Sequence, residues 1–270
     1  MVVQHNLSAM NTNRQMGVVT SALQKSTEKL SSGYKITRAG DDAAGLSISE
    51  KMRSQIRGLN KASDNAQDGI SLIQVAEGAL NETHSILQRM NELATQAAND
   101  TNTSVDRQSI KDEIEQLNEE LDRISTTTQF NKQDLLTGGF SGKLQVGALE
   151  GQTMDVKISL AVSAKGLNVS AVEVSTNVKA GAAMQSIQDA IESVSKQRSK
   201  LGAIQNRLEH TINNLDTNAE NTQAAESRIR DTDMADEMVQ YSKNNILSQA
   251  GQSMLTQANQ QTQGVLSLLQ

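Results

Sequence analysis

The chain has 270 residues and a net charge of −6; it contains no Cys, Pro or Trp, and only two Tyr and two Phe. The absence of Cys excludes disulfides, zinc–thiolate sites and thiol catalysis, and the acidic balance argues against binding to nucleic acid. No apolar run approaches the ~20 residues needed to cross a bilayer, which argues against membrane insertion. With so few aromatic side chains, we expect a thin core of aliphatic residues, as in paired helices.

We assign residues 1–32 to an N-terminal helix of an inner core domain. Small or apolar side chains recur there every seven residues, a spacing that keeps one seam along a helix. The seam consists of Val2, Ala9, Met16, Leu23 and Leu30. Three glycines then interrupt the pattern, so residues 33–45 are interpreted as a connector.

Residues 46–130 are predicted to form the N-terminal part of a helical rod domain. Apolar or small side chains step by three and four from Ile56 to Ala97, which indicates one long helix. A run of helix-capping residues at 99–104 predicts a turn. A second helix is expected to follow, with the same spacing at Ile110, Ile114, Leu117, Leu121 and Ile124.

The period of the pattern changes in residues 131–180, which we assign to a small β segment. Glycines crowd its first part, and apolar residues then alternate with polar ones from Met154 to Leu160. Such alternation is typical of a half-buried strand. The apolar residues between Leu167 and Val174 predict one more strand or an extended stretch.

Helical spacing resumes in residues 181–225, the C-terminal part of the rod domain, and continues in a C-terminal helix at 226–270. The seam of this last helix is predicted to be Leu247, Ala250, Met254, Ala258, Val265 and Leu269. The fold class is therefore mainly α: a long antiparallel helical bundle or coiled-coil rod with a small β-hairpin insert and paired terminal helices. Both ends of the chain then lie at the same end of the rod.

Charge supports pairing of the two ends. Residues 1–40 carry five basic side chains against one acidic one, whereas residues 231–270 carry four acidic side chains against one basic one. Opposite charges favour association and fix register. The acidic cluster could equally serve the last helix alone, by stabilising its N-terminus through the helix dipole.

The sequence contains no pattern that indicates catalysis, a cofactor or a metal site. The three histidines are far apart, and no phosphate-binding loop, dinucleotide fingerprint or nucleophile elbow occurs. Asp41 and Asp42 could suggest a calcium loop, but the alternating oxygen ligands and the closing Glu are missing. Capping of a helix that begins near Ala43 explains them better. We therefore expect a protein that is not an enzyme.

Five stretches closely resemble bacterial flagellin, the subunit of the flagellar filament. They are NLSAMNTN at 6–13, LSSGYKITRAGDDAAGLSISEKM at 30–52, NAQDGISLIQVAEGAL at 65–80, QRMNELA at 88–94, and the end of the chain from Met254 to Gln270. Flagellins share an inner layer of paired terminal helices and a helical rod layer outside it. The short middle of this chain implies a minimal form without outer domains.

The resemblance also implies an extracellular polymer of identical subunits, exported through the flagellum's own type III pathway. The lack of an apolar signal-peptide core near residue 1 agrees with that route. Implied partners are an export chaperone, the filament cap, hook–filament junction proteins and a Toll-like receptor of animal hosts. The positions that match the receptor-binding motif are Arg89, Leu93 and Glu113. In the filament the same residues could serve as ordinary contacts between subunits.

Two other classes of function fit the sequence less well. A non-polymerising binding protein, such as a junction component or a secreted coiled-coil effector, would lack the full signatures at 38–52 and 254–270. A membrane-active helical protein fits poorly because the terminal segments are rich in Gln and Asn. A filament subunit that folds as it assembles is the favoured interpretation.

Overall fold

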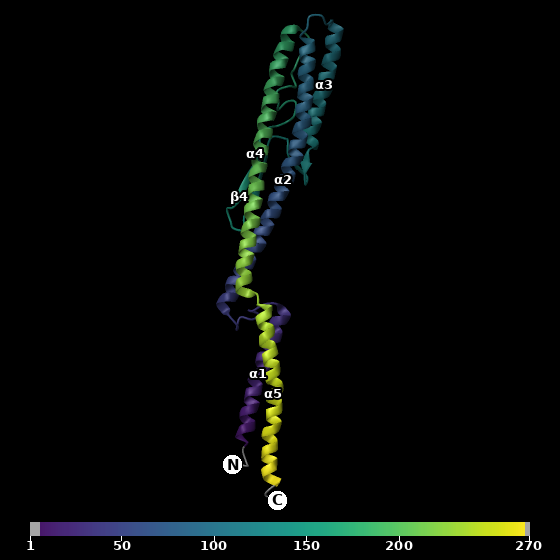
Figure 1. The fold of residues 1–270 in the computed structure, drawn as a ribbon. Helices are drawn as coiled ribbons and strands as arrows, with labels where there is room; N and C mark the ends of the chain where they lie inside the picture. Colours follow the sequence, from purple (N-terminus) through teal and green to yellow (C-terminus); the bar gives the residue numbers. More distant parts are fainter. Residues whose placement is uncertain (1–5, 268–270) are drawn as a thin grey trace. The chain divides into compact units, whose positions relative to one another are not determined.

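The computed structural model describes residues 6–267, and the side chains of residues 6–261. Over this range the chain forms five helices and four short strands, so the predicted mainly α fold with a small β insert is confirmed (Figure 1). The chain divides into two compact units. Unit 1 combines Met1–Ile56 with Glu220–Gln270, and unit 2 is the continuous stretch Arg57–Ala219.

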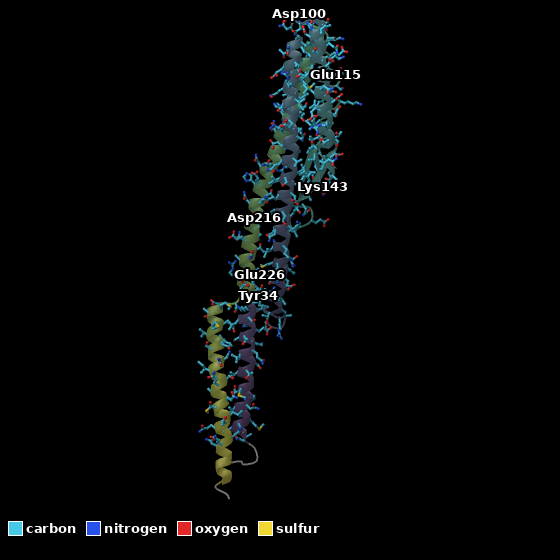
Figure 2. The ribbon with its side chains drawn as sticks, turned by 90° about the vertical axis from the view of Figure 1, so that its right-hand side faces the viewer. Tyr34, Asp100, Glu115, Lys143, Asp216 and Glu226 are labelled. Carbon is cyan, nitrogen blue, oxygen red and sulfur yellow. The ribbon has the colours of Figure 1, made fainter. Side chains whose placement is uncertain are left out.

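Unit 2 is built on three helices that run side by side: α2 (Ala43–Ala97) from Arg57 onward, α3 (Ser104–Thr127) and α4 (Asn177–Arg230) up to Ala219 (Figure 1). Neighbouring helices are antiparallel. The side chain of Asn177 donates to the carbonyl of Ala98 at 2.7 Å, and that of Ser63 donates to Asp216 at 3.0 Å. Charged side chains such as Glu115, Lys143 and Asp216 cover the outside of this bundle (Figure 2).

The core of unit 2 is a set of helical seams. On α4, one buried apolar side chain recurs every seven residues: Ala180, Ile187, Val194, Leu201, Leu208 and Leu215. Buried residues of α2 and α3 face this seam, among them Leu80, Leu87 and Ile114. Apolar side chains at this spacing pack between helices as they do in coiled coils. The spacing in the sequence therefore located the faces that these helices bury.

The turn predicted at 99–104 is present, and it ends in a capping box. Thr103 accepts from the backbone N–H of Asp106, and the Asp106 carboxylate accepts from the backbone N–H of Thr103 at 2.9 Å. The Thr103 hydroxyl also donates to this carboxylate at 2.7 Å, and the hydrogen bonds from the Thr103 hydroxyl and N–H lower the pKa of Asp106. Two otherwise unpaired N–H groups at the start of α3 are satisfied in this way.

The β insert consists of two separate antiparallel pairs. Strands β1 (Gln129–Phe130) and β2 (Gln133–Asp134) are joined by Asn131 and Lys132, whose φ angles of 49° and 62° are left-handed. Strands β3 (Phe140–Gln145) and β4 (Thr153–Ile158) pair with Phe140 opposite Ile158. The predicted alternation along β4 is confirmed, because Met154, Val156 and Ile158 are buried and their polar neighbours are exposed.

β3 lies close to α2. A Cβ atom added at Gly69 would lie 2.3 Å from Cδ1 of Leu144, so the missing side chain allows this approach.

The strand predicted as one interpretation of residues 167–174 is not formed. Residues 163–171 make a series of turns instead, in which the backbone N–H of Val169 donates to the carbonyl of Ala164 at 2.9 Å. Leu167, Val169 and Val174 are nevertheless buried. The alternating apolar side chains therefore indicated burial and not a strand. The segment is a loop whose apolar side chains are buried, and no neighbouring strand pairs with its backbone.

Unit 1 contains α1 (Leu7–Ser32) and α5 (Met234–Ser267), together with the first turns of α2 and the last turns of α4. Helix α4 continues past the boundary predicted at residue 225 and ends at Arg230. Asp233 then starts α5, because its carboxylate accepts from the backbone N–H of Ala235 at 2.9 Å. Within residues 6–267, no helix combines the length and the apolar character needed to cross a membrane.

The buried seam of α4 should set the stability of unit 2. Leu201 is completely buried, and we expect Leu201→Ala to lower the free energy of unfolding by about 2–5 kcal/mol. Val178 lies on the same helix with 84% of its surface exposed, and Val178→Ala should change that free energy by less than about 0.5 kcal/mol. Urea unfolding followed by circular dichroism measures both. Equal effects of the two variants would contradict the packing described here.

Terminal helix pair and candidate assembly surface

α1 and α5 pack against each other in antiparallel directions. At one end, the side chain of Asn6 donates to the carbonyl of Ala258 at 2.9 Å and also caps α1 by accepting from the N–H of Ala9. At the other end, Lys29 Nζ lies 3.6 Å from a carboxylate oxygen of Glu237. These contacts place the N-terminal end of α1 beside the C-terminal half of α5.

The predicted N-terminal seam lies on the face that α1 turns toward α5. Its described members are all half-buried: Ala9, Met16, Leu23 and Leu30. Between them, Thr12 and Val19 are half-buried and Ser26 is buried. The helix therefore has the alternating three- and four-residue spacing of a coiled-coil seam. Val2, the first member of the predicted seam, lies outside the described residues.

The predicted C-terminal seam is out of phase with the face that α5 turns toward α1. That face is formed by Tyr241, Ser248, Gly251, Leu255 and Ala258, which are half-buried or buried. A Cβ atom added at Gly251 would lie 3.8 Å from Cγ of Met16.

Of the predicted seam, Ala258 lies on this face and is 7% exposed, whereas Leu247 and Met254 are 44% and 63% exposed, and Ala250 is exposed as well. Of the members of this seam whose side chains are described, Ala258 alone therefore faces α1. The α1-facing surface combines small residues with Tyr241 and Leu255, whereas Leu247 and Met254 lie elsewhere on the helix. Val265 and Leu269 lie outside the residues whose side chains are described.

The larger apolar residues of α5 form a stripe that no other described residue covers. We call it the outer stripe, and it consists of Val239, Ile246, Leu247, Ala250 and Met254. Residues seven apart share one helix face, so Val239 and Ile246 lie in line, as do Leu247 and Met254. Neighbouring exposed apolar residues of this kind mark interaction surfaces. Sequence reasoning identified Leu247 and Met254 but missed Val239 and Ile246, which the same seven-residue spacing could have revealed.

The acidic residues at the start of α5 serve both roles that the sequence left open. Asp233 caps the helix by accepting from the backbone N–H groups of Ala235 and Asp236. Glu237 instead forms the ion pair with Lys29 of α1. Among the described residues, this is the one direct ion pair between α1 and α5.

The connector that follows α1 and the connector that precedes α5 are hydrogen-bonded to each other. The N–H of Lys35 donates to the carbonyl of Arg230 at 2.7 Å, and the N–H of Thr232 donates to the carbonyl of Gly33 at 3.0 Å. The Arg230 guanidinium lies 4.6 Å from the centre of the Tyr34 ring, a cation–π contact. Gly33 ends α1 with a left-handed φ of 75°, which glycine adopts without strain. Both connectors are thereby held at one place.

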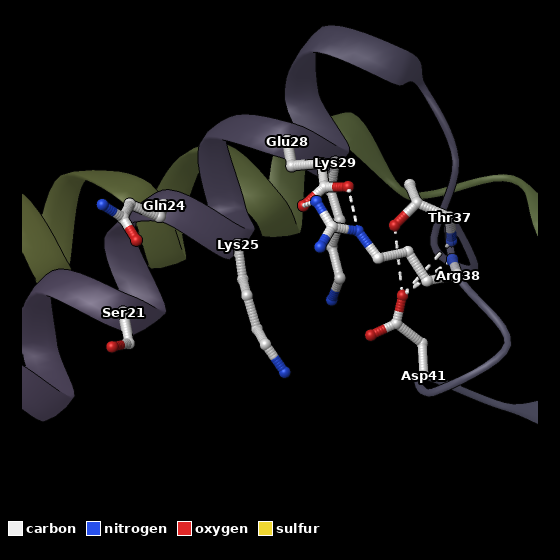
Figure 3. Close-up of a pocket in the computed structure, with 8 residues that line it drawn as sticks. All are labelled: Ser21, Gln24, Lys25, Glu28, Lys29, Thr37, Arg38 and Asp41. Carbon is white, nitrogen blue, oxygen red and sulfur yellow. Dashed lines mark hydrogen bonds and ion pairs between the residues drawn. The ribbon is translucent and has the colours of Figure 1, made fainter.

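A hollow of about 300 Å³ lies between α1 and the connector that follows it (Figure 3). Its walls include the bidentate pair of Arg38 and Glu28, with hydrogen bonds of 3.0 and 3.1 Å. Asp41 accepts from the backbone N–H and the hydroxyl of Thr37 and from the backbone N–H of Arg38. The hydrogen bonds from Arg38 and Thr37 lower the pKa of Asp41. Lys25 also lines the hollow (Figure 3).

The helix cap predicted for the Asp41–Asp42 pair is formed by Asp42. Its carboxylate accepts from the backbone N–H of Gly45 at 2.9 Å, at the start of α2.

Two of the three candidate receptor-contact residues lie together at the surface of unit 2. Arg89 on α2 and Glu113 on α3 form an ion pair of 2.9 Å, with roughly half of each side chain exposed. Hydrogen bonding to Glu113 raises the pKa of Arg89. Leu93, by contrast, is 2% exposed and belongs to the core. Its position one turn from Arg89 suggested a shared surface, but Leu93 points to the side of α2 that the other helices cover.

Comparison with known proteins identifies the family. A family model for the bacterial flagellin N-terminal helical region matches residues 3–141, and one for the bacterial flagellin C-terminal helical region matches residues 184–269. A flagellin of Halalkalibacterium halodurans is 56% identical over 271 residues, which cover 100% of both chains. The chain belongs to the bacterial flagellin family.

Other flagellins agree with this assignment. A flagellin of Bacillus subtilis is 50% identical over 304 residues that cover all of both chains. The crystal structure of a Bacillus cereus flagellin is similar at a TM-score of 0.51 and 33% identity, over 60% of this chain and 94% of that one. Flagellins are structural subunits that polymerise into the extracellular flagellar filament, and they are not enzymes. In this short flagellin, the region between the two family models contains the β4 strand and the turns after it.

The hydrogen bonds of Asp41 should make the first connector sensitive to acid. A carboxylate whose pKa is lowered by folding stabilises the folded state above its unfolded pKa, and this contribution is lost as pH falls through the lowered value. We expect Asp41→Ala to lower the protection factors of the Thr37 and Arg38 amides against hydrogen exchange at neutral pH, and we expect protonation of Asp41 in strong acid to lower the same protection factors in the unmodified chain. Asp68→Ala, at an exposed position of α2, is the control and should leave both amides unchanged. Unaltered exchange in Asp41→Ala would contradict this role.

Proposed function

We propose that the chain assembles by coupled folding, in which its terminal segments become stably ordered only when they dock onto neighbouring copies. The observation that carries this proposal is the outer stripe of α5. Ile246 and Met254 are 66% and 63% exposed although they are large and apolar, while the opposite face of the same helix is packed against α1. A contact between copies requires such a second helix surface, one that is apolar and still exposed in the single chain.

Within this proposal the two seams have different partners. Ala9, Met16, Leu23 and Leu30 hold α1 to α5 of the same chain. The outer stripe binds a different surface on the next copy. A repeated contact between two unlike surfaces generates a helical array when its rotation does not close into a ring.

The dependence of order on assembly follows from how little each terminal helix buries alone. In the described residues, α1 has one buried residue, Ser26, and α5 has one, Ala258. Isolated helices are marginal in water, and most helical stability in proteins comes from packing. Docking on neighbours would supply the missing packing. Residues 1–32 and 226–270 would then form the inner layer of the filament, and residues 46–130, 131–180 and 181–225 the layer outside it.

The partners implied by the family fit the same surface. An export chaperone that covers the outer stripe would prevent premature polymerisation before type III export. The filament cap would guide docking of the exposed terminal helices, and hook–filament junction proteins would offer the first copies a related surface. These roles all depend on an apolar stripe that is uncovered in the single chain.

The outer stripe should be required for polymerisation but not for folding of the single chain. We expect Ile246→Asp to slow seeded elongation about a hundredfold or more, because docking would bury an unpaired charge. Val105→Asp changes an equally apolar and exposed residue of α3, and it should elongate normally. Electron microscopy and light scattering measure elongation. Normal filaments from Ile246→Asp would refute the assignment of the stripe.

Circular dichroism of the same samples tests coupled folding. The unmodified chain should gain helix as it assembles, whereas a chain that ends at Ile229 should neither polymerise nor gain helix. Assembly without a gain of helix would refute coupled folding, although the outer stripe could still be the docking surface.

A second candidate function is recognition by a Toll-like receptor of the host. The exposed pair of Arg89 and Glu113 supports it, because a surface guanidinium and carboxylate from two adjacent helices offer donors and acceptors at one place. The burial of Leu93 confines its role to supporting α2 beneath this pair. In the filament, the pair would instead contact a neighbouring subunit.

We expect Arg89→Ala and Glu113→Ala each to weaken receptor binding by the monomer about tenfold, as loss of a charged interface hydrogen bond does. Lys200→Ala, an exposed position on α4, is the matched control and should bind normally. Surface plasmon resonance with the immobilised receptor ectodomain measures the affinities. Unchanged binding by both variants would exclude this site.

A further inference from the structure

The described methionines of unit 2 are covered, and the strongly exposed ones belong to unit 1. Met90 and Met154 are buried in the core of unit 2, and Met184 of unit 2 is half-buried, as are Met16 and Met52 of unit 1. Four described methionines are exposed by more than a third, and all of them lie on the terminal helices: Met10, Met234, Met238 and Met254. The thioethers that water and small oxidants reach are thus concentrated on α1 and α5.

Three of these exposed methionines lie on α5. Met254 belongs to the outer stripe, seven residues after Leu247, and 63% of its surface is exposed. Met234 and Met238 are one helical turn apart near the start of α5, and each is about half exposed. The chain has no Cys and no Trp, so thioethers are its most readily oxidised side chains.

We propose that Met254, supported by Met234 and Met238, is an oxidation site through which peroxide controls assembly of the free chain. This inference rests on the proposed docking of the outer stripe. The oxidant is hydrogen peroxide or an organic peroxide. Oxidation acts on the single chain, and docking protects the same sulfur atoms because neighbouring copies then cover them.

The reaction is a two-electron oxygen transfer. The thioether sulfur attacks one oxygen of the peroxide, a sulfur–oxygen bond forms, and the oxygen–oxygen bond breaks. The departing oxygen takes up the proton left by the transferred oxygen, so hydrogen peroxide yields methionine sulfoxide and water. Sulfur is oxidised and peroxide is reduced, and no further reactant is needed. Sulfoxide reductases reverse the step.

The product is incompatible with an apolar contact. A sulfoxide oxygen is a strong hydrogen-bond acceptor, and the residues beside Met254 on the stripe are Leu247 and Ala250, which carry no side-chain donor. A polar group buried without a partner weakens an interface by about tenfold or more. Met10, on α1, lies away from the half-buried seam and is not required by this argument.

The experiment uses the full chain and hydrogen peroxide. Monomer is oxidised to graded extents, sulfoxide at each methionine is quantified by peptide mass spectrometry, and elongation on untreated seeds is measured. We expect elongation to fall about tenfold as Met254 is converted, while Met90 and Met154 stay reduced. Treatment with both stereospecific sulfoxide reductases should restore elongation. The same peroxide dose given to finished filaments should leave Met254 mostly reduced.

Two triple variants distinguish oxidation of the exposed methionines of α5 from oxidation elsewhere in the chain. Leu conserves the volume of Met and does not form a sulfoxide. The M234L/M238L/M254L chain should elongate equally well before and after peroxide. The M52L/M90L/M184L chain, which keeps every exposed methionine, should remain sensitive.

The inference is overturned if fully oxidised Met254 leaves elongation unchanged, or if M234L/M238L/M254L is inhibited as strongly as the unmodified chain. Failure of the proposed function is recognised separately. In that case the untreated chain itself does not elongate, or Ile246→Asp elongates normally while peroxide has its effect elsewhere.

Discussion

The structure of unit 1 depends on a helix pair that is covered on one side. α1 and α5 hold each other through half-buried residues, small residues such as Gly251, and one ion pair between Lys29 and Glu237. A pair of helices without a third layer cannot bury two apolar faces. The apolar residues of the outer stripe therefore stay exposed in the single chain. This exposure is what the proposed docking of neighbouring copies requires.

The two connectors hold one end of this helix pair together. Arg230 contacts the ring of Tyr34 and accepts the N–H of Lys35, and Ser49 donates to Glu226 at 2.8 Å within the same unit. Hydrogen bonds between segments so distant in sequence hold the end of α1 beside the start of α5.

The sequence was sufficient to predict the helices and most of the buried faces of unit 2. Seven-residue spacing locates a face such as that of Leu201 and Leu208, because one partner layer covers it. On α5, spacing indicated which residues are apolar but not which molecule covers them. Spacing also did not decide whether Leu93 is buried, because residues four apart differ by about 40° around the helix axis, and that difference can separate core from surface. The contacts between the connectors, such as Lys35 with Arg230, are non-local and left no pattern in the sequence.

The division of the chain into one continuous and one discontinuous unit has a consequence for the entropy of folding. The hydrogen bond between Asn6 and Ala258 joins residues 252 positions apart, and closing so long a flexible loop is unfavourable. Unit 2 is continuous, and packing of Leu59 with Leu215 already brings its two ends together. Once unit 2 has folded, the loop that α1 and α5 must close is reduced to the two terminal segments themselves. This topology therefore favours folding of the middle of the chain before its two ends.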